Sequence, residues 1–313
     1  MKNRLTLLLL LISIFTQPLS VFAADNSTSE QLPAADNIYN AENVDDSKPQ
    51  ISEKAKYALL ALGINTDDFD RDKEVTRGEF AQLIFKASMG ARSSYTSESV
   101  NFYDVQTDSD LNNAVGYLYD CGIVSGTGDG LFSPDKNIEY AAAMKIAMGL
   151  LKYPQDYTLY DSIVSGNLAQ NVRRENNNSI KYESVFELIY NMLNTNTAKP
   201  LTDSELYMNE ELDLYFGKGI VEDDGIVSLT GKSALRENSI VIDGTEYICD
   251  VTKDNLIGKS VNYYYVDSDE PEIKSLYCPS GYNKTLRIDS GDIEDFDGSV
   301  YTYCNNEKKS RNK

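Results

Sequence analysis

The stretch that decides the fold runs from residue 102 to residue 150 and reads FYDV at 102–105, GIVSG at 122–126, GDGLFSPD at 128–135 and IEYAAAMKIAMGL at 138–150. Apolar residues after Ile138 recur at the spacing of one helical face. Gly122 follows an earlier helical stretch, at the point where a left-handed cap is favoured. The glycine-rich run lacks the lysine and the preceding strand of a phosphate loop, which favours a tight turn. The stretch therefore predicts a unit of helix, loop and helix.

The same unit recurs on both sides of this stretch. Val75, Ile138 and Ile180 each open a helix, and the apolar positions that follow share one spacing in all three copies. These positions are Phe80, Leu83, Ile84 and Ala87; Ala143, Ile146, Ala147 and Leu150; and Val185, Leu188, Ile189 and Met192. A helical hairpin cannot bury such a stripe alone, but three hairpins packed together can. We expect three repeats, at about residues 51–90, 101–153 and 154–197, although the first helix of the third fits more than one register.

This order of elements resembles the S-layer homology repeat: F-x-D-V, a helix, G-I-x-x-G, a D-G-x-F-x-P loop, I-T-R-A-E and a second helix. Residues 75–79 read VTRGE and resemble I-T-R-A-E, whereas the copies at Ile138 and Ile180 are degenerate. The resemblance implies a mainly α domain of three prongs with grooves between them. It also implies non-covalent attachment of a secreted protein to the bacterial cell wall or S layer. The implied partners are secondary cell-wall polysaccharide, often pyruvylated, or S-layer components.

Four residues are candidates for binding this polysaccharide: Thr76, Arg77, Glu79 and Asp104. An Arg at a helix start can hold a carboxylate by two parallel hydrogen bonds, and free backbone N–H groups assist it. Thr76 and Glu79 have the spacing of a capping box, so Arg77 is either a ligand contact or a surface residue of a well-capped helix. Asp104 is either a turn or capping acid or a sugar contact.

The other copies lack these groups. Glu139-Tyr140 and Lys181-Tyr182 stand where the first copy has Thr76-Arg77. Exchanging Arg for Tyr forfeits a charge-assisted contact of about 1.5 to 3 kcal/mol, so at least two grooves are expected to be weak or empty. The tyrosines at these positions either stack on a sugar or fill the core. No Trp exists for stacking on a sugar, and Asp110 or Leu111 stands where the family usually has an aromatic residue.

Two further hypotheses belong to other classes of protein. Residues 68–79, from Asp68 to Glu79, place acids at positions 1, 3, 5 and 12 of an EF-hand-like calcium loop, but Lys73 stands at position 6, which favours Gly. The alternative function is therefore a secreted calcium-binding structural module. A hydrolase with paired carboxylates is the third hypothesis, and no specific pair of acids supports it.

Composition narrows the function. The 313 residues contain no His and no Trp, which excludes His bases, Ser-His-Asp and Cys-His pairs and His-ligated zinc. A formal net charge of -20 argues against a nucleic-acid partner. The four cysteines show no metal-binding spacing, and a disulfide between Cys249 and Cys278 is conceivable. We predict neither an enzyme nor a cofactor nor a resident metal.

The ends of the chain point to export. Residues 1–23 have a basic start, an apolar run and a small-x-small tripeptide ending at Ala23, as a signal peptide does. Residues 24–50 are polar and acidic, which predicts a disordered spacer. No later stretch offers the roughly 20 apolar residues that a membrane span needs, so no membrane association is expected after cleavage. Residues 305–313 form a polar tail, and the abrupt end after a strand suggests truncation from a longer protein.

Residues 201–304 change pattern to short aromatic and β-branched runs, which predict strands. They lie at residues 214–221, 225–229, 239–242, 247–251, 260–266, 273–277, 285–288 and 300–303. The pairs at 224–225, 243–244 and 297–298 are Asp-Gly turn signals. The sequence thus predicts a second, small all-β domain, an antiparallel barrel or sandwich. The GKGIV start at 217–221 and IGKSVNYY at 257–264 resemble β modules that follow S-layer homology repeats, without implying an activity.

Overall fold

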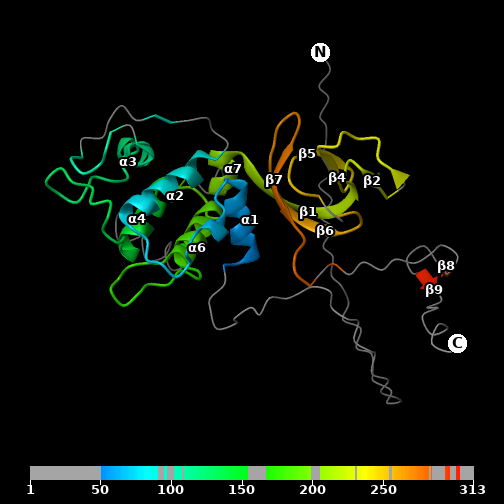
Figure 1. The fold of residues 1–313 in the computed structure, drawn as a ribbon, viewed down its shortest axis with the longest axis horizontal. Helices are drawn as coiled ribbons and strands as arrows, with labels where there is room; N and C mark the ends of the chain where they lie inside the picture. Colours follow the sequence, from blue (N-terminus) through cyan, green and yellow to red (C-terminus); the bar gives the residue numbers. More distant parts are fainter. Residues whose placement is uncertain are drawn as a thin grey trace, which may run out of the picture. The chain divides into compact units, whose positions relative to one another are not determined.

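The computed structural model describes residues 51–90, 95–96, 102–107, 109–153, 167–198, 205–229, 231–253, 256–281, 283, 293–296 and 301–303. The predicted signal peptide, spacer and tail lie outside the described residues, as does the predicted strand at 285–288. The described residues all belong to one unit of the chain, which starts at Lys48. Helices come first along this unit and a mixed sheet follows, with α1 (Glu53–Ala61) packed beside β6 (Ser260–Val266) and β7 (Glu272–Tyr277) (Figure 1).

Among the described residues, five α-helices lie where the periodicity predicts them, whereas the helix at Tyr207–Leu212 lies in the stretch for which only strands were predicted. The helices are α1 (Glu53–Ala61), η1, a single 3-10 turn (Thr66–Asp68), α2 (Arg77–Met89), α3 (Asp110–Asp120), α4 (Tyr140–Leu150), α6 (Tyr182–Leu193) and α7 (Tyr207–Leu212). Hydroxyl groups of Ser52, Thr76 and Ser109 cap α1, α2 and α3. Gly122 adopts a φ of 69° after α3, which is the left-handed cap expected there.

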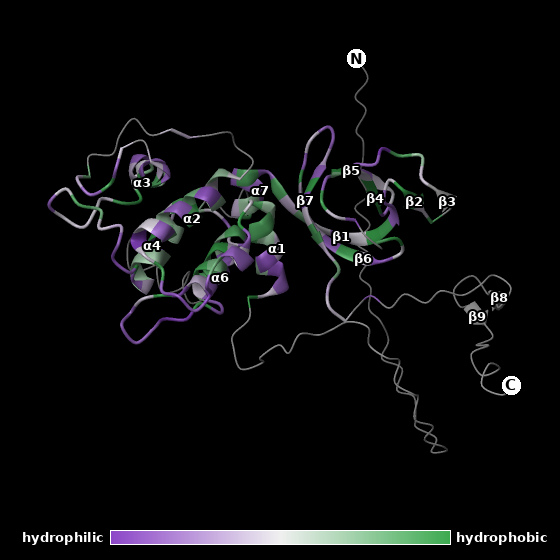
Figure 2. Cartoon of the chain, in the orientation of Figure 1, coloured by the Kyte–Doolittle hydropathy of each residue, from purple (hydrophilic) through white to green (hydrophobic). Residues whose placement is uncertain are grey.

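The helices share one core. Phe80, Ile146 and Leu188, which occupy aligned positions in the sequence, are all buried in the same hydrophobic cluster. Figure 2 shows the apolar residues along α2, α4 and α6, whereas the loops that join the helices are largely hydrophilic. This distribution agrees with three apolar stripes that pack against each other in one core, as opposed to stripes buried in separate surroundings.

The three segments that precede α2, α4 and α6 meet and bind one another through their backbones. In each case the first residue of a helix donates its N–H to a carbonyl in the turn before the next helix. The bonds are Arg77 to Lys136 at 2.8 Å, Tyr140 to Asn178 at 2.8 Å and Tyr182 to Lys73 at 3.1 Å. Val75, Ile138 and Ile180 lie between these bonds with 0%, 1% and 0% of their surface exposed. We call this arrangement the junction. It depends on backbone groups and apolar side chains.

A buried carboxylate ties α1 to α6. Glu187 of α6 is only 5% exposed, and its Oε1 accepts the backbone N–H of Ser52 at 2.8 Å. Ser52 is the N-cap of α1, so Glu187 satisfies a donor that the helix itself leaves without a partner.

The sheet contains β1 (Leu214–Asp223), β2 (Val227–Ser228), β3 (Gly231–Lys232), β4 (Ser239–Ile242), β5 (Thr245–Cys249), β6 (Ser260–Val266) and β7 (Glu272–Tyr277). The strands follow the order β3-β2-β1-β4-β5-β7-β6, and β6 pairs again with β1, so the pairing closes on itself. A separate hairpin pairs β8 (Ile293–Phe296) with β9 (Tyr301–Tyr303). Asp243 and Gly244, both with positive φ, form the β4–β5 turn that the Asp-Gly pair predicted.

The prediction of an antiparallel barrel or sandwich needs correction, because β5 and β7 run parallel and the sheet is mixed. The cause is the connection between them. Residues 250–271 include β6, so the chain leaves β5, crosses to the far side of β7 and returns through a hairpin. The sheet has its own apolar cluster around Val221 and Val261. Leu214 and Tyr264, however, belong to the helical core, so the two parts are packed together.

Candidate functional site

The first candidate site is the start of α2, where the sequence places a capping box. Thr76 Oγ1 accepts the Glu79 N–H at 3.2 Å, and Glu79 Oε2 accepts the Thr76 N–H at 2.9 Å, so the box is confirmed. Lys73 forms an ion pair with Glu79 Oε1 at 2.6 Å. Burial alone raises the pKa of Glu79, but Lys73 and the bonds from Thr76 outweigh burial and hold this pKa below its usual value. Glu79 is thereby occupied by the protein itself.

Arg77 reaches from α2 to the loop of the second copy. Its Nε donates to the carbonyl of Phe132 at 3.0 Å, and its guanidinium carbon lies 4.8 Å from the centre of the Phe132 ring. The terminal amino groups of Arg77 donate to none of the residues that the structure describes. Burial lowers the pKa of Arg77, while Glu139 and Asp104 oppose this shift. Arg77 therefore holds the loop with one nitrogen and keeps its other donors available.

Asp104 binds the same loop through its carboxylate. Its two carboxylate oxygens accept the N–H groups of Phe132 at 2.8 Å and Ser133 at 2.7 Å. Burial raises the pKa of Asp104, yet these two bonds and the nearby Arg77 charge bring the pKa below its ordinary value. The structure thus brings Arg77 and Asp104 together around residues 132–133, with Thr76 and Glu79 at the same helix start.

The matched positions in the other copies are filled differently. Tyr182 is 5% exposed and packs against Phe69 and Phe186, with ring centres 5.0 and 5.9 Å away. Burial also raises the pKa of Tyr182. Tyr140 is half-buried, and burial raises its pKa as well. The sequence left two roles open for these tyrosines, stacking on a sugar or filling the core. In the structure Tyr182 fills the core.

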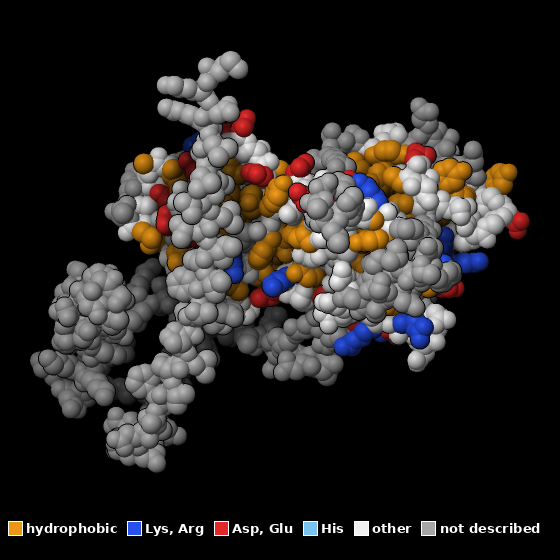
Figure 3. Space-filling model, turned by 180° about the vertical axis from the view of Figure 1, so that it is seen from behind, with side chains coloured by type: hydrophobic (Ala, Val, Ile, Leu, Met, Phe, Trp, Pro, Cys, Tyr) orange, Lys and Arg blue, Asp and Glu red, His pale blue; other side chains and the backbone are white. Residues whose placement is uncertain are grey.

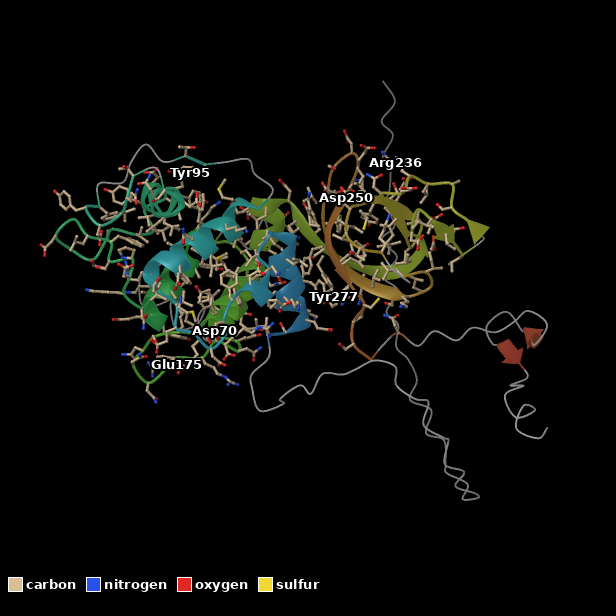
Figure 4. The ribbon with its side chains drawn as sticks, viewed as in Figure 1. Asp70, Tyr95, Glu175, Arg236, Asp250 and Tyr277 are labelled. Atoms are coloured by element: carbon tan, nitrogen blue, oxygen red, sulfur yellow. The ribbon has the colours of Figure 1, made fainter. Side chains whose placement is uncertain are left out.

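The second candidate site is a groove of about 420 Å³ between α2 and α3, which we call the α2–α3 groove. It is lined by Leu62, Gln82, Phe85, Lys86, Met89, Gly90, Tyr95, Asp110 and Asn113. Its aromatic lining is Phe85 and Tyr95, and Tyr117 packs against both rings, with ring centres 5.3 to 6.1 Å apart among the three. Figure 4 shows Tyr95 beside α3. Aromatic faces combined with a few amide, carboxylate and ammonium groups are the usual lining of a site for a polar organic ligand.

Most residues of this groove escaped the sequence analysis. Gln82, Lys86 and Met89 lie at helical spacing on the face of α2 opposite its buried stripe, a signal that could have been found. Asp110 was noted only because an aromatic residue is usual there. The Lys86 ammonium donates to the carbonyl of Gly63 at 2.6 Å, so it lies next to the C-terminal end of α1.

The EF-hand-like loop does not bring its carboxylates together. Asp70 accepts the Asp72 N–H at 3.2 Å, Asp68 accepts from Asn65 at 2.9 Å, and Glu79 is occupied as described. Figure 4 shows Asp70 on this loop. Within the described ranges no group of three or more His, Cys, Asp or Glu residues is placed to hold a metal ion. The geometry gives the calcium hypothesis no support.

Other sequence-based expectations can be placed as well. Cys249 and Cys278 are free thiols, one buried and one half-buried.

Among the described residues no helix is both long and apolar enough to cross a bilayer. On the face shown in Figure 3 the Lys and Arg side chains are spread over the surface and do not form one field. On this face, attraction to an anionic polymer would rest on separate local cations.

Comparison with known proteins agrees with this architecture. The S-layer homology domain family matches residues 101–144, which include α3, the Phe132 loop and the start of α4. The chain therefore carries an S-layer homology domain. It is also similar to a surface layer protein of Brevibacillus choshinensis, at 23% identity over 292 residues. This similarity covers 83% of the present chain and 24% of that protein, so the chain spans about a quarter of its relative's length.

Proposed function

We propose that the chain attaches to the bacterial cell wall from outside the cell, through its S-layer homology domain, and binds a wall polysaccharide in the α2–α3 groove. The observation that carries the proposal is this groove, which lies between α2 and α3 and combines aromatic faces with Gln82, Lys86 and Asn113. Cell-surface location follows from the domain and from the surface layer relative. Binding and presentation, not catalysis, is the role that these groups support.

Arg77 completes the proposal. A pyruvylated sugar carries a carboxylate, and the terminal N–H groups of Arg77 are suited to it because Nε alone is used by Phe132. In this proposal Asp104, Thr76 and Glu79 position Arg77 and its loop and do not touch the ligand. Residues 51–197 would then be the attachment part, made of three repeats, and residues 201–304 the part that is presented or that contacts S-layer components.

The test is retention of the purified protein on cell-wall sacculi with and without their pyruvylated polymer. We expect Lys86→Gln combined with Gln82→Ala to weaken retention at least tenfold, because a cation and an amide donor are lost from the groove. Lys136→Gln is the matched control, since it removes one exposed cation from a loop outside the groove. Equal retention of the groove variant and the control would refute the groove as the binding site.

A further inference from the structure

A second cleft lies where the helices meet the sheet, away from the α2–α3 groove. It measures about 630 Å³ and is bounded by the start of α1 on one side and the outer face of β1 and β6 on the other. We call it the joint cleft. Its main lining residues are Lys54, Phe216, Lys218, Ser260, Asn262 and Tyr277. None of them belongs to the region matched by the S-layer homology family.

The strand register explains the floor of the joint cleft. Lys218 of β1 pairs with Asn262 of β6, and Ile220 pairs with Ser260. Burial alternates along β1, so Phe216, Lys218 and Ile220 are the residues that point outward. Phe216 keeps 38% of its surface exposed, which leaves an apolar ring face beside a row of polar groups.

The walls of the cleft are held firmly. The rings of Tyr57 on α1 and Tyr277 on β7 are stacked, with centres 4.2 Å apart. Ser275 Oγ donates to the Tyr57 carbonyl at 2.6 Å, and Ser280 Oγ donates to Glu53 at 2.6 Å. Figure 4 shows Tyr277 against α1. A cleft whose walls are bonded to each other exists before a ligand arrives, so binding needs little reorganisation.

The charge of the cleft is opposite to that of the chain. Lys54 and Lys218 both line it, and neither forms an ion pair with any residue in the described ranges. The acid at the rim, Glu53, is bonded to Ser280. In a protein of net charge -20, two cations that pair with no acid among the described residues concentrate local attraction for an anion at this place.

Hydrogen-bonding groups line the joint cleft together with the two lysines. Asn262 Nδ2 donates to the Tyr277 hydroxyl at 3.1 Å, which orients its amide. At the far rim the Asn283 amide brackets Ser260, accepting its N–H at 2.8 Å and donating to its carbonyl at 2.7 Å. Oriented amide and hydroxyl groups beside an aromatic ring are suited to a hydroxylated ring, and the lysines are suited to its negative charge.

From this geometry we infer that the joint cleft is a second ligand site and that it binds an anionic saccharide, a hydroxylated chain bearing carboxylate or phosphate. Lys54 and Lys218 contact the anionic groups, Asn262 and Ser260 the hydroxyls, and Phe216 the sugar face. The site is independent of the α2–α3 groove, so it stands or falls separately from the proposed wall attachment.

The experiment titrates the full chain without its signal peptide by calorimetry. Three oligomers of similar length serve as probes: a galacturonate oligosaccharide, a glycerol-phosphate oligomer and a neutral glucan. We expect the anionic probes to bind at least tenfold more tightly than the glucan, and this advantage to shrink in high salt. Phe216→Ala is expected to weaken the galacturonate probe several-fold and to leave glycerol phosphate unchanged, which tells the two sources of charge apart.

The double variant Lys54→Gln, Lys218→Gln is expected to lose at least tenfold in affinity for the anionic probes. Both lysines lie at the surface, so the fold is retained, and thermal unfolding checks this. Lys136→Gln removes a charge of the same kind outside both the joint cleft and the α2–α3 groove, and it is expected to bind the probes as the unaltered chain does. The inference is overturned if neither anionic probe binds better than the glucan, or if the double variant binds like this control.

Discussion

The starts of α2, α4 and α6 occupy matching places in the junction but are built differently. At α2 a complete capping box surrounds Arg77, whereas α4 and α6 begin without any side-chain cap and carry Tyr140 and Tyr182. The backbone bonds between the three segments are nevertheless equivalent. The comparison teaches that the three starts share backbone bonds and buried apolar side chains, whereas an arginine with a capping box occurs only at α2 among them.

The largest expected effect tests whether the fold depends on the apolar centre of the junction. Ile138→Ala is expected to lower the free energy of unfolding by about 2 to 5 kcal/mol, because a fully buried side chain is replaced by a cavity. Urea denaturation measures this loss. Glu139→Ala, at the exposed neighbouring position, is the control and is expected to change stability by less than about 0.5 kcal/mol. Similar losses for both variants would contradict the role given to Ile138.

A second test separates binding from folding. Arg77→Ala is expected to weaken wall retention roughly 10- to 100-fold while the helical content is unchanged, since a charge-assisted contact of about 1.5 to 3 kcal/mol is lost. Tyr140→Ala, the same position in the second copy, is expected to leave retention as it is. Retention on sacculi and circular dichroism measure the two properties. Unchanged retention of Arg77→Ala would remove this residue from the site.

Asp104 allows a test by pH. The folded pKa of Asp104 lies below its unfolded value, so its contribution to stability is present above about pH 4 and is lost as pH falls through the folded pKa. Asp104→Ala leaves the Phe132 and Ser133 N–H groups without their acceptor, at a cost of about 1 to 2 kcal/mol at pH 7. The difference from the unaltered chain is expected to shrink below pH 4 in denaturation experiments. A difference that stays constant with pH would argue against the carboxylate bonds.

The smallest expected effect is an increase in stability. Lys181 is the N-cap of α6 and forms no capping bond with its side chain, so Lys181→Thr is expected to stabilise the chain by about 0.5 to 1 kcal/mol. Thermal unfolding shows the change, with Thr76→Ala as the reverse experiment at α2. A loss of stability in Lys181→Thr would mean that the Lys181–Glu175 contact at 3.8 Å matters more than the cap.

The sequence predicted the helices well because their signals are local. The spacing of Phe80 and Leu83 and the Thr76–Glu79 pair depend on neighbours along the chain, and the structure bears them out. The structure also explains why a glycine stands at position 217 in the GKGIV start, because a Cβ there would overlap the Tyr263 ring.

Long-range features were beyond the sequence. The parallel pairing of β5 and β7 and the loop that Arg77 and Asp104 share depend on residues far apart along the chain. The same holds for the α2–α3 groove and the joint cleft, whose Lys86 and Lys218 look like ordinary surface residues in the sequence.

The stacked pair of Tyr57 and Tyr277 has a mechanical consequence. Because α1 contacts β7 while the chain itself runs from α7 directly into β1, a chain held at the wall and pulled through its sheet would divide the tension between these two paths. The path through Tyr57 and Tyr277 is non-covalent, so it would separate before the covalent path through α7.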